Sequence, residues 1–589
     1  MSTPNDARLE ALLVAGVLEP VDVELALALS AMSARGSADL RLAIALASRA
    51  PRDGHTCLVL ADTTREHVLT DDGRIAVPEH LDWPSADELR TALHESALLS
   101  PADGVAPLVL HADRLYLQRF DVLEARLAHA VRTRLAVASA ELDAHDIARL
   151  RTLFPDDPAH GADHAQHDAA VLALRSPLAI ITGGPGTGKT TTVLRVLAAL
   201  LARAPNDQLP EVLLLAPTGK AASRLTESVR HGLALLPDSA LDTARRAAIP
   251  AHADTIHRAL GVHPDRPHRP RHHAGNPLAA DIVVVDETSM VDLPLMSRLF
   301  DAVRPEARLV LLGDSDQLAS VDAGAVLRDL VESPIVSPAL ATLHRSRRFS
   351  DSSALGALVV ALRGDNWMAV DRALTSAPEA GQAAVRLVGS GRPDQVPSEV
   401  LDAVRAHSAR LASAPTAEAA LNELGRLRLL TALRRGPLGA DAINARIVEE
   451  RGNSLASGTP ILITQNSPDD GLANGDLGVS WEDGAGQRVA LFDGADGPRA
   501  ISVRRLPRWE PAFAMTVHKA QGSEFDQVIV LLPPPPSPIL TRELVYTAVS
   551  RAREQITLVG PRDAIAAAHS ARVRRATGLR ERLAAPADR

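Results

Sequence analysis

The chain lacks residues on which several classes of protein depend. Its 589 residues include one cysteine, Cys57, which excludes an internal disulfide, a cysteine-based zinc site and an iron–sulfur cluster held by four thiolates. Charged residues interrupt the apolar runs before about 18 residues, so we expect no membrane span and no membrane partner. The first 35 residues lack the basic start and apolar block of a signal peptide, and we therefore expect a cytoplasmic protein.

An excess of positive charge is missing as well, because the net charge is −9. Any nucleic acid must therefore be held in a local basic groove. Aromatic residues make up only 2% of the chain, so base stacking on aromatic side chains must be sparse.

Lysine is the scarcest cation, with three residues among 63 lysines and arginines. Lys189, Lys220 and Lys519 lie in GGPGTGKT, APTGKAA and TVHKAQGSEF, stretches typical of nucleotide or nucleic-acid chemistry. Lysine is a compact, mobile point charge, whereas arginine is a rigid planar fork. A tight phosphate cradle has room for the first and not for the second, so this distribution indicates an ATP-driven motor.

Short apolar runs separated by helical patterns predict the fold class. The first set covers 178–182, 212–216, 281–285 and 308–312, and the second covers 427–432, 527–532 and 555–559. Continuous apolar runs of this kind are expected of parallel strands that are covered on both faces. We predict an α/β protein with two domains built on doubly wound parallel sheets, and a small β insertion with strands at 478–482, 488–492 and 499–503.

These patterns divide the chain into six parts. We expect an N-terminal α/β docking domain at 1–125, a linker at 126–160 and a first P-loop motor domain at 161–335. The second motor domain would take 336–451 and 512–575, with the insertion at 452–511 and a C-terminal tail at 576–589.

A phosphate-binding loop follows the first strand of the first domain. Glycines in this loop let backbone N–H groups converge on phosphate oxygens at a helix N-terminus. Lys189 would reach the β- and γ-phosphates of ATP, and the Thr190 hydroxyl would bind Mg²⁺. The predicted ATP-binding residues are Gly183, Gly184, Pro185, Gly186, Thr187, Gly188, Lys189, Thr190 and Thr191.

Later strand ends supply the other catalytic groups. Asp286 would hold the Mg²⁺ ion and Glu287 would orient or deprotonate the attacking water. Gln317 is placed to sense the γ-phosphate. Arginine clusters at 343–349 and 546–553 lie outside the first sheet, where arginine fingers would make hydrolysis depend on domain closure.

This ordered set resembles the superfamily 1 helicases, and most closely the RecD family, the alpha subunit of exodeoxyribonuclease V. The matching stretches include APTGKAASRL, TIHRALG, VVDETSMVDLPLM, LLGDSDQLASVDAGAVL, NGDLGV, FAMTVHKAQGSEFD and ELVYTAVSRAR. They cover nearly all of residues 166–554. PLVLHADRLYLQRF, at 107–120, resembles the leading domain of the family more weakly.

The resemblance implies further roles. Gln166 would read the adenine, and Arg348 and Arg551 would be the γ-phosphate arginines. The two motor domains would be RecA-like, with parallel sheets, and the insertion would be SH3-like. Travel on DNA would run 5′ to 3′. The residues expected along the single-stranded DNA path are Thr218, Lys220, His257, Thr516, His518 and Lys519.

The leading hypothesis is an ATP-dependent DNA helicase of a RecBCD-type complex that processes DNA ends in double-strand-break repair and recombination. Its partners would be a RecB-like helicase-nuclease and a RecC-like subunit. We expect the nuclease on a partner, because its usual core needs a lysine and all three lysines are assigned. Arg266–His273 is either a solvated loop or a DNA contact.

Three alternatives stay open. A free-standing RecD-related helicase usually carries an N-terminal extension, and residues 1–125 look too short for it. A conjugative relaxase needs an N-terminal tyrosine beside a histidine metal site, but Tyr116 has no such cluster near it. A scaffold without activity is disfavoured by the intact ATPase residues.

Overall fold

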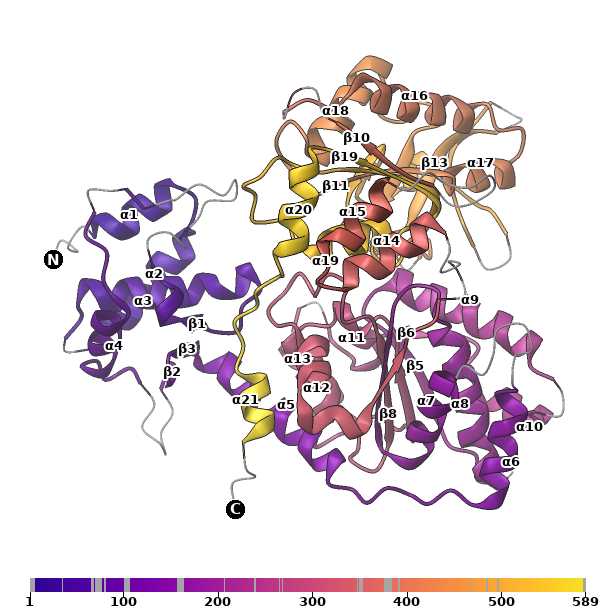
Figure 1. Ribbon diagram of the computed structural model, residues 1–589, viewed down its shortest axis with the longest axis horizontal. Helices are drawn as coiled ribbons and strands as arrows, with labels where there is room; N and C mark the ends of the chain where they lie inside the picture. Colours follow the sequence, from indigo (N-terminus) through magenta and orange to yellow (C-terminus); the bar gives the residue numbers. More distant parts are fainter. Residues whose placement is uncertain are drawn as a thin grey trace.

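The computed structural model describes residues 6–585 with short gaps. The gaps lie at 34, 65–67, 69–76, 79–80, 100–105, 156–163, 206, 238–239, 264, 267, 347, 349–352, 376–383, 390–391, 393, 468, 484–485 and 495–496. Two α/β domains lie one above the other in Figure 1, with the N-terminal domain to one side. Within the described residues, no helix is both long and apolar enough to cross a bilayer.

Domain 1 is built on a six-stranded sheet in the order β6-β5-β7-β8-β4-β9, with all neighbours parallel. The strands are β4 (Leu178–Gly183), β5 (Val212–Ala216), β6 (Asp254–Thr255), β7 (Ile282–Val285), β8 (Arg308–Gly313) and β9 (Leu340–Leu343). Because β9 pairs with β4, domain 1 extends beyond the expected boundary at residue 335.

Both faces of this sheet are covered, as continuous apolar strands require. On one face, Leu178 and Ile180 pack with α5 (Gln118–Leu135) and α12 (Leu293–Ala302). On the other, Ala179 and Ile181 pack with α7 (His164–Arg175) and α8 (Lys189–Arg203). Alternate residues of one strand therefore enter different cores, and the carboxyl edge of the sheet is left for function.

Domain 2 repeats this plan with a five-stranded parallel sheet in the order β10-β19-β18-β11-β17. Its strands are β10 (Ala384–Val388), β11 (Leu427–Thr431), β17 (Ala514–Thr516), β18 (Phe525–Leu531) and β19 (Ala552–Val559). The helices that cover this sheet are α14 (Ala354–Arg363), α15 (Trp367–Thr375), α16 (Ser398–Ala412), α18 (Ala440–Arg451), α19 (Arg542–Val549) and α20 (Arg562–Ser570), while α17 (Ala417–Leu424) packs against β13 and β14 of the insertion. The predicted α/β class with two parallel sheets is confirmed.

The insertion in domain 2 is a five-stranded antiparallel sheet in the order β15-β14-β13-β12-β16. Its strands are β12 (Pro460–Ile463), β13 (Leu477–Glu482), β14 (Arg488–Phe492), β15 (Arg499–Ser502) and β16 (Trp509–Pro511). It has a core of its own around Ile461 and Phe492. The SH3-like character of this sheet stays a prediction.

The N-terminal domain combines helices with a small antiparallel sheet of order β1-β3-β2. Its elements are α1 (Ala7–Val14), α2 (Pro20–Ala31), α3 (Ala38–Arg49), α4 (Ala86–His94), β1 (Leu58–Val59), β2 (Leu108–His111) and β3 (Arg114–Leu117). Helix α5 leads from it along domain 1, where Leu127 and Val131 join the core. Part of residues 126–160, expected as a linker, is therefore packed helix, and α6 (Ala144–Leu153) contributes Leu150 and Leu153 to the other core.

The C-terminal segment ties all three domains together. After α20 the chain runs in extended form back to α21 (Leu579–Ala584), which lies against α5 in Figure 1. Leu579 and Leu583 are buried in the core shared by α5 and domain 1. We call residues 571–585 the C-terminal strap. Much of the stretch expected as a tail is thus part of the packed structure.

One buried carboxylate anchors the strap. Glu124 of α5 is fully buried, and its oxygens accept hydrogen bonds from both the N-terminal domain and the strap. The donors are the hydroxyls of Thr56, Tyr116 and Thr577, the backbone N–H of Gly578 and Nε of Arg582. A buried charge is stable only when its hydrogen bonds are complete. The Glu124 carboxylate therefore needs the donors of the N-terminal domain and those of the strap together.

Replacing Glu124 with alanine should therefore loosen the strap. Removing one partner of a buried charged network costs about 3–5 kcal/mol, so we expect local hydrogen exchange around residues 577–582 to be faster by roughly 10²- to 10³-fold or more. The control is Glu581→Ala, whose side chain is 56% exposed and pairs with Arg114. Equal exchange rates in the two variants would contradict the anchoring role.

Candidate active site

The phosphate-binding loop joins β4 to α8 at the carboxyl edge of the domain 1 sheet. The loop is held in shape from within. The Lys189 ammonium donates to the carbonyls of Gly183 and Gly184 at 2.6 and 3.0 Å, and the Thr187 hydroxyl donates to Gly184 at 2.9 Å. These bonds fold the loop around the start of α8, where backbone N–H groups are available to an anion.

Two glycines of the loop have no room for a side chain. Gly186 and Gly188 have φ angles of 73° and 79°, in the left-handed region that favours glycine. A Cβ at Gly186 would lie 2.4 Å from Cβ of Arg348, and one at Gly188 would lie 2.6 Å from Nε2 of Gln166. Gln166 itself is buried and donates to the carbonyl of Thr187 at 3.0 Å. Side chains from other segments therefore approach the loop closely.

The two acidic residues follow β7 at the same sheet edge. Burial and the adjacent Glu287 charge raise the pKa of Asp286, and the Lys189 ammonium opposes that rise. Glu287 has φ 52°, a left-handed conformation that costs a non-glycine residue about 1–3 kcal/mol. Such strain is typical of residues whose position serves a function.

Gln317 follows β8 and is 7% exposed. Its side-chain Nε2 donates to Oδ2 of Asp314 at 3.1 Å. The side chain is thus held within the turn that ends β8, beside the carboxylates that follow β7.

Two arginines enter the site from outside the domain 1 sheet. Arg551 lies just before β19, is 4% exposed, and donates to the carbonyl of Thr547 at 3.1 Å and to the Ser550 hydroxyl. Burial lowers the pKa of Arg551, while the charges of Glu287 and Glu524 raise it. Arg348 lies in the segment between the domains and donates through Nη2 to Oε1 of Glu524 at 2.6 Å.

All six predicted catalytic residues line one cavity of about 760 Å³ together with the phosphate-binding loop. They are Lys189, Asp286, Glu287, Gln317, Arg348 and Arg551. The cavity lies between the domains, because Arg551 and Glu524 belong to domain 2 and the carboxylates to domain 1. Residues separated by more than 300 positions therefore share one site.

Several charged residues that line this cavity were given no individual role by the sequence analysis, and Glu524 has the most contacts with the arginines of the site. Glu524 accepts from Arg348 and pairs with Arg553 at 3.4 Å and with Arg224 at 3.9 Å. Glu524 lies inside the GSEF stretch, which carried the signal. Arg224 follows APTGKAA within a helix, and nothing in its local pattern separates it from the other arginines of the chain.

The residues of the cavity fit a nucleoside triphosphate with a divalent ion. At two loop positions, Gly186 and Gly188, neighbouring side chains leave room for glycine alone. Glycines at such positions are expected of a loop whose backbone N–H groups hold phosphates. The Thr190 hydroxyl and the Asp286 carboxylate both line the cavity, and hard oxygen donors of this kind suit Mg²⁺. Arginines on the opposite wall supply the remaining positive charge.

The predicted DNA-binding residues follow other strands. Thr218 follows β5 and caps α9 (Gly219–Leu235), while His257 is exposed in the short helix α11 (Ile256–Ala259) after β6. Thr516 ends β17, an edge strand of domain 2, and its Oγ1 accepts from the backbone of Lys519 at 3.3 Å. His518 is half-buried, and burial lowers its pKa. Thr218 and His257 therefore lie at the β5 and β6 side of the domain 1 sheet, away from β4 and β8. Thr516 and His518 lie at the β17 edge of the domain 2 sheet.

Two lysines make contacts that the sequence did not suggest. The Lys220 ammonium donates to the carbonyl of Gly475 in the insertion and to the Ser523 hydroxyl of domain 2. Burial lowers its pKa to about 8. The Lys519 ammonium pairs with Glu510 of β16. A DNA contact by either lysine stays a prediction, and both bind the insertion to the rest of the protein.

The basic run 266–273 forms an exposed connection between α11 and β7, with positions 264 and 267 outside the described residues. The backbone of Arg271 donates to Gly261, and His273 pairs with Asn276. Its contact with DNA remains a hypothesis.

Comparison with known proteins agrees with this geometry. Residues 14–116 match the family "RecBCD enzyme subunit RecD, N-terminal domain", residues 166–323 match an AAA domain, and residues 511–559 match a UvrD-like helicase C-terminal domain. The chain is 41% identical to the RecBCD enzyme subunit RecD of Mycolicibacterium smegmatis, over 97% of its own length and 98% of that protein. The chain belongs to the RecD family. The resemblance seen in its motifs is confirmed.

Other relatives carry related names. The RecBCD enzyme subunit RecD of Mycobacterium tuberculosis is 40% identical over 97% of this chain and 95% of that protein. The ATP-dependent RecD2 DNA helicase of Deinococcus radiodurans is 32% identical over 80% of this chain but only 59% of its own length. The RecD-family chain therefore matches the first two over nearly their whole length.

Replacing Lys189 with alanine should abolish DNA-stimulated ATP hydrolysis and leave the fold intact, because the ammonium supplies charge at the phosphates. Lys189→Arg should fail as well, since the cradle has no room for a planar fork. Steady-state ATPase assays with single-stranded DNA, together with thermal unfolding, test both variants. Wild-type turnover in Lys189→Ala would overturn the site assignment.

Arg551→Ala should retain ATP binding and lose hydrolysis by about 10³-fold, the effect typical of an arginine finger. Binding is measured by titration with a fluorescent ATP analogue and hydrolysis by single-turnover kinetics. Arg562→Ala, an exposed arginine of α20 that pairs with Asp371, is the control. Loss of binding in Arg551→Ala would give this arginine a structural role instead.

Proposed function

We propose that this RecD-family chain is an ATP-dependent 5′–3′ DNA helicase and the alpha subunit of a RecBCD-type complex. It acts in the cytoplasm on DNA ends during double-strand-break repair and recombination. The observation that carries the proposal is the single cavity between the two α/β domains, lined by the phosphate-binding loop, Asp286, Glu287, Gln317 and both arginines.

Each wall of the cavity has a part in hydrolysis. Domain 1 binds the phosphates through the loop backbone and Lys189, and Glu287 orients or deprotonates the attacking water. When bound, Mg²⁺ would be held by Thr190 and Asp286 and would neutralise the developing phosphate charge. Domain 2 contributes Arg551, which stabilises the transition state only when the two domains are close together.

Closure of this cavity is also the means of movement. The proposed DNA residues lie at strand ends of both domains, so a change in the cleft changes the spacing between Thr218 or His257 on one side and Thr516 or His518 on the other. Alternate tightening of the DNA contacts of domain 1 and of domain 2 would move the protein along the DNA strand. Adenine selection by Gln166 is part of this proposal, supported by its bond to the loop at Thr187.

The choice of a complex subunit over a free-standing helicase rests on the extent of similarity. The chain matches proteins named RecBCD enzyme subunit RecD over at least 95% of their length in M. smegmatis and M. tuberculosis, but the RecD2 helicase over only 59%. The expected partners are RecB-like and RecC-like subunits, which would dock on the N-terminal domain. The nuclease would belong to a partner, because its usual core needs a lysine and each of the three lysines lies in a stretch already assigned to the motor.

Strand separation on tailed duplexes tests the proposal. The isolated chain is mixed with ATP and a duplex that carries a 5′ or a 3′ single-stranded tail. We expect unwinding from the 5′ tail alone, with Lys189→Ala as the inactive control. Unwinding from the 3′ tail alone would contradict the polarity.

Two further outcomes concern the partners. Intact DNA-stimulated ATPase without unwinding, restored by RecB-like and RecC-like subunits, would support the complex and contradict a free-standing helicase. Absence of DNA-stimulated ATPase both with and without these subunits would contradict the motor function itself.

A further inference from the structure

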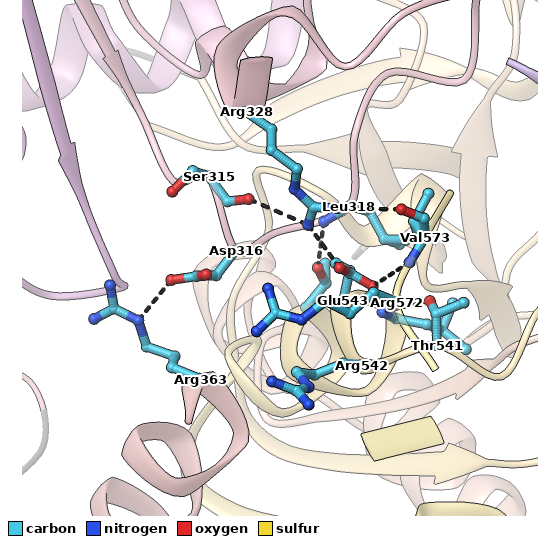
Figure 2. Close-up of polar contacts among 12 residues, drawn as sticks. Ser315, Asp316, Leu318, Arg328, Arg363, Thr541, Arg542, Glu543, Arg572 and Val573 are labelled. Carbon is cyan, nitrogen blue, oxygen red and sulfur yellow. Dashed lines mark hydrogen bonds and ion pairs between the residues drawn. The ribbon is translucent and has the colours of Figure 1, made fainter. Parts of the chain in front are cut away.

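The turn that carries Gln317 is held by domain 2 as well as by its own domain. Arg363 of α14 donates through Nε to Oδ2 of Asp316 at 2.7 Å, on one side of Gln317 (Figure 2). On the other side, the backbone N–H of Leu318 donates to the Thr547 hydroxyl of α19 at 2.9 Å. Residues flanking the proposed γ-phosphate sensor are therefore bonded across the domain interface.

The same face of domain 2 is fastened to domain 1 by a second group of bonds. Arg328 of α13 (Val326–Glu332) pairs with Glu543 of α19 at 2.6 Å, and Glu543 also accepts from the backbone of Val573 in the strap (Figure 2). These contacts fix the position of α19, the helix that carries Tyr546 and Thr547.

Tyr546 reaches the sensor through a shared acceptor. Its hydroxyl donates to Oδ2 of Asp314 at 2.8 Å, and this oxygen also accepts from Nε2 of Gln317 at 3.1 Å. Tyr546 and Asp314 are each 1% exposed. Oδ1 of Asp314 accepts from the backbone N–H of Asp316 at 3.1 Å, so the Tyr546 hydroxyl and the Gln317 amide are the two side-chain donors and both act on Oδ2. Because the site is closed to water, loss of the hydroxyl would leave Oδ2 with one donor fewer.

The Tyr546 hydroxyl, which donates to Oδ2 of Asp314, also lies beside the phosphate-binding loop. A Cβ at Gly184 would lie 3.0 Å from the Tyr546 hydroxyl, so the hydroxyl lies at the point where the loop, the β8 turn and domain 2 meet. Burial raises the pKa of Asp314, while the Lys189 ammonium and the Tyr546 hydroxyl favour its charged form.

The bonds to Asp314 leave Gln317 able to act. An amide side chain has two N–H groups and one carbonyl oxygen. Asp314 accepts one N–H, which leaves the second N–H and the oxygen for the γ-phosphate and the attacking water. The orientation of the amide thus depends on the orientation of the Asp314 carboxylate.

We propose that Tyr546 is a positioning residue for ATP hydrolysis: its hydroxyl, supplied by domain 2, orients the Asp314 carboxylate that in turn orients the Gln317 amide. The inference rests on the proposed role of Gln317 as the γ-phosphate sensor. It adds a second dependence of hydrolysis on domain closure, separate from the arginine of domain 2. When α19 moves away, Asp314 loses one of its two side-chain donors and the Gln317 amide is no longer fixed.

Tyr546→Phe removes the hydroxyl alone and is the first test. We expect kcat for single-stranded-DNA-stimulated ATP hydrolysis to fall roughly 10-fold or more, as for loss of a hydrogen bond to a charged group, with KM for ATP within twofold of wild type. The chain offers a matched control in Tyr116→Phe, its only other tyrosine. Tyr116 is also 1% exposed and donates to a buried carboxylate, Glu124 at 3.1 Å, so its loss should leave kcat unchanged.

A double-mutant cycle with Gln317→Ala separates this proposal from the function on which it rests. If Tyr546 acts through Gln317, adding Tyr546→Phe to Gln317→Ala should lower kcat by less than twofold. An equal loss in both backgrounds, or a wild-type kcat in Tyr546→Phe, would overturn the positioning role. A wild-type kcat in Gln317→Ala would instead remove the sensor assignment.

The variant Asp314→Asn tests in a second way whether Tyr546 acts through the Asp314 carboxylate. It keeps the shape of the side chain and removes the charge that attracts both donors. We expect kcat to fall as in Tyr546→Phe, with no further loss when the two changes are combined. Additive losses would mean that Asp314 and Tyr546 act independently and would contradict the proposal. Thermal unfolding of each variant confirms that the rates refer to folded protein.

Discussion

The charge balance in the cavity between the two α/β domains is the constraint on which the structure depends. Domain 1 places two carboxylates at the end of one buried strand, β7, where burial and the neighbouring charge raise the pKa of Asp286. A polyphosphate bound there brings further negative charge. Cations from a second body would stabilise that charge, and Arg551, the arginine proposed for this task, is held beside the cavity by backbone and hydroxyl acceptors of domain 2. We therefore propose that hydrolysis is coupled to domain closure, because neither domain has both halves of the site.

The rest of the chain positions these two halves. The strap returns from domain 2 to α5, so the N-terminal domain, domain 1 and domain 2 share the contacts around Glu124 and Arg328 (Figures 1 and 2). The insertion is bound at Lys220 and Lys519, two of the three lysines. The insertion and the N-terminal domain, the surface proposed for partner subunits, are therefore both bonded to the bodies that form the cleft.

Local signals account for what the sequence predicted well. The strands β4, β5, β7, β8, β11, β18 and β19 lie in runs of apolar residues, and the phosphate-binding loop and Asp286 follow such strands directly. The half-buried β9 and β10 have weaker patterns and were missed. Contacts between distant residues were out of reach for a different reason. Tyr546 and Asp314 are 232 positions apart, and no periodicity or motif pairs them. The packed strap escaped notice because its short helix, α21, gains stability from α5 rather than from its own six residues.

A distance measurement between the two α/β domains shows whether ATP closes the cavity between them. Cys57 is buried and its pKa is raised to about 12, so spin labels would react with cysteines introduced at two exposed positions, Ile147 in domain 1 and Met368 in domain 2. With single-stranded DNA and a transition-state analogue of ATP, the account predicts a single shorter distance than without nucleotide, and no such change in Lys189→Ala. The same distance distribution with and without the analogue, in a protein that hydrolyses ATP at its normal rate, would contradict the coupling of hydrolysis to domain closure.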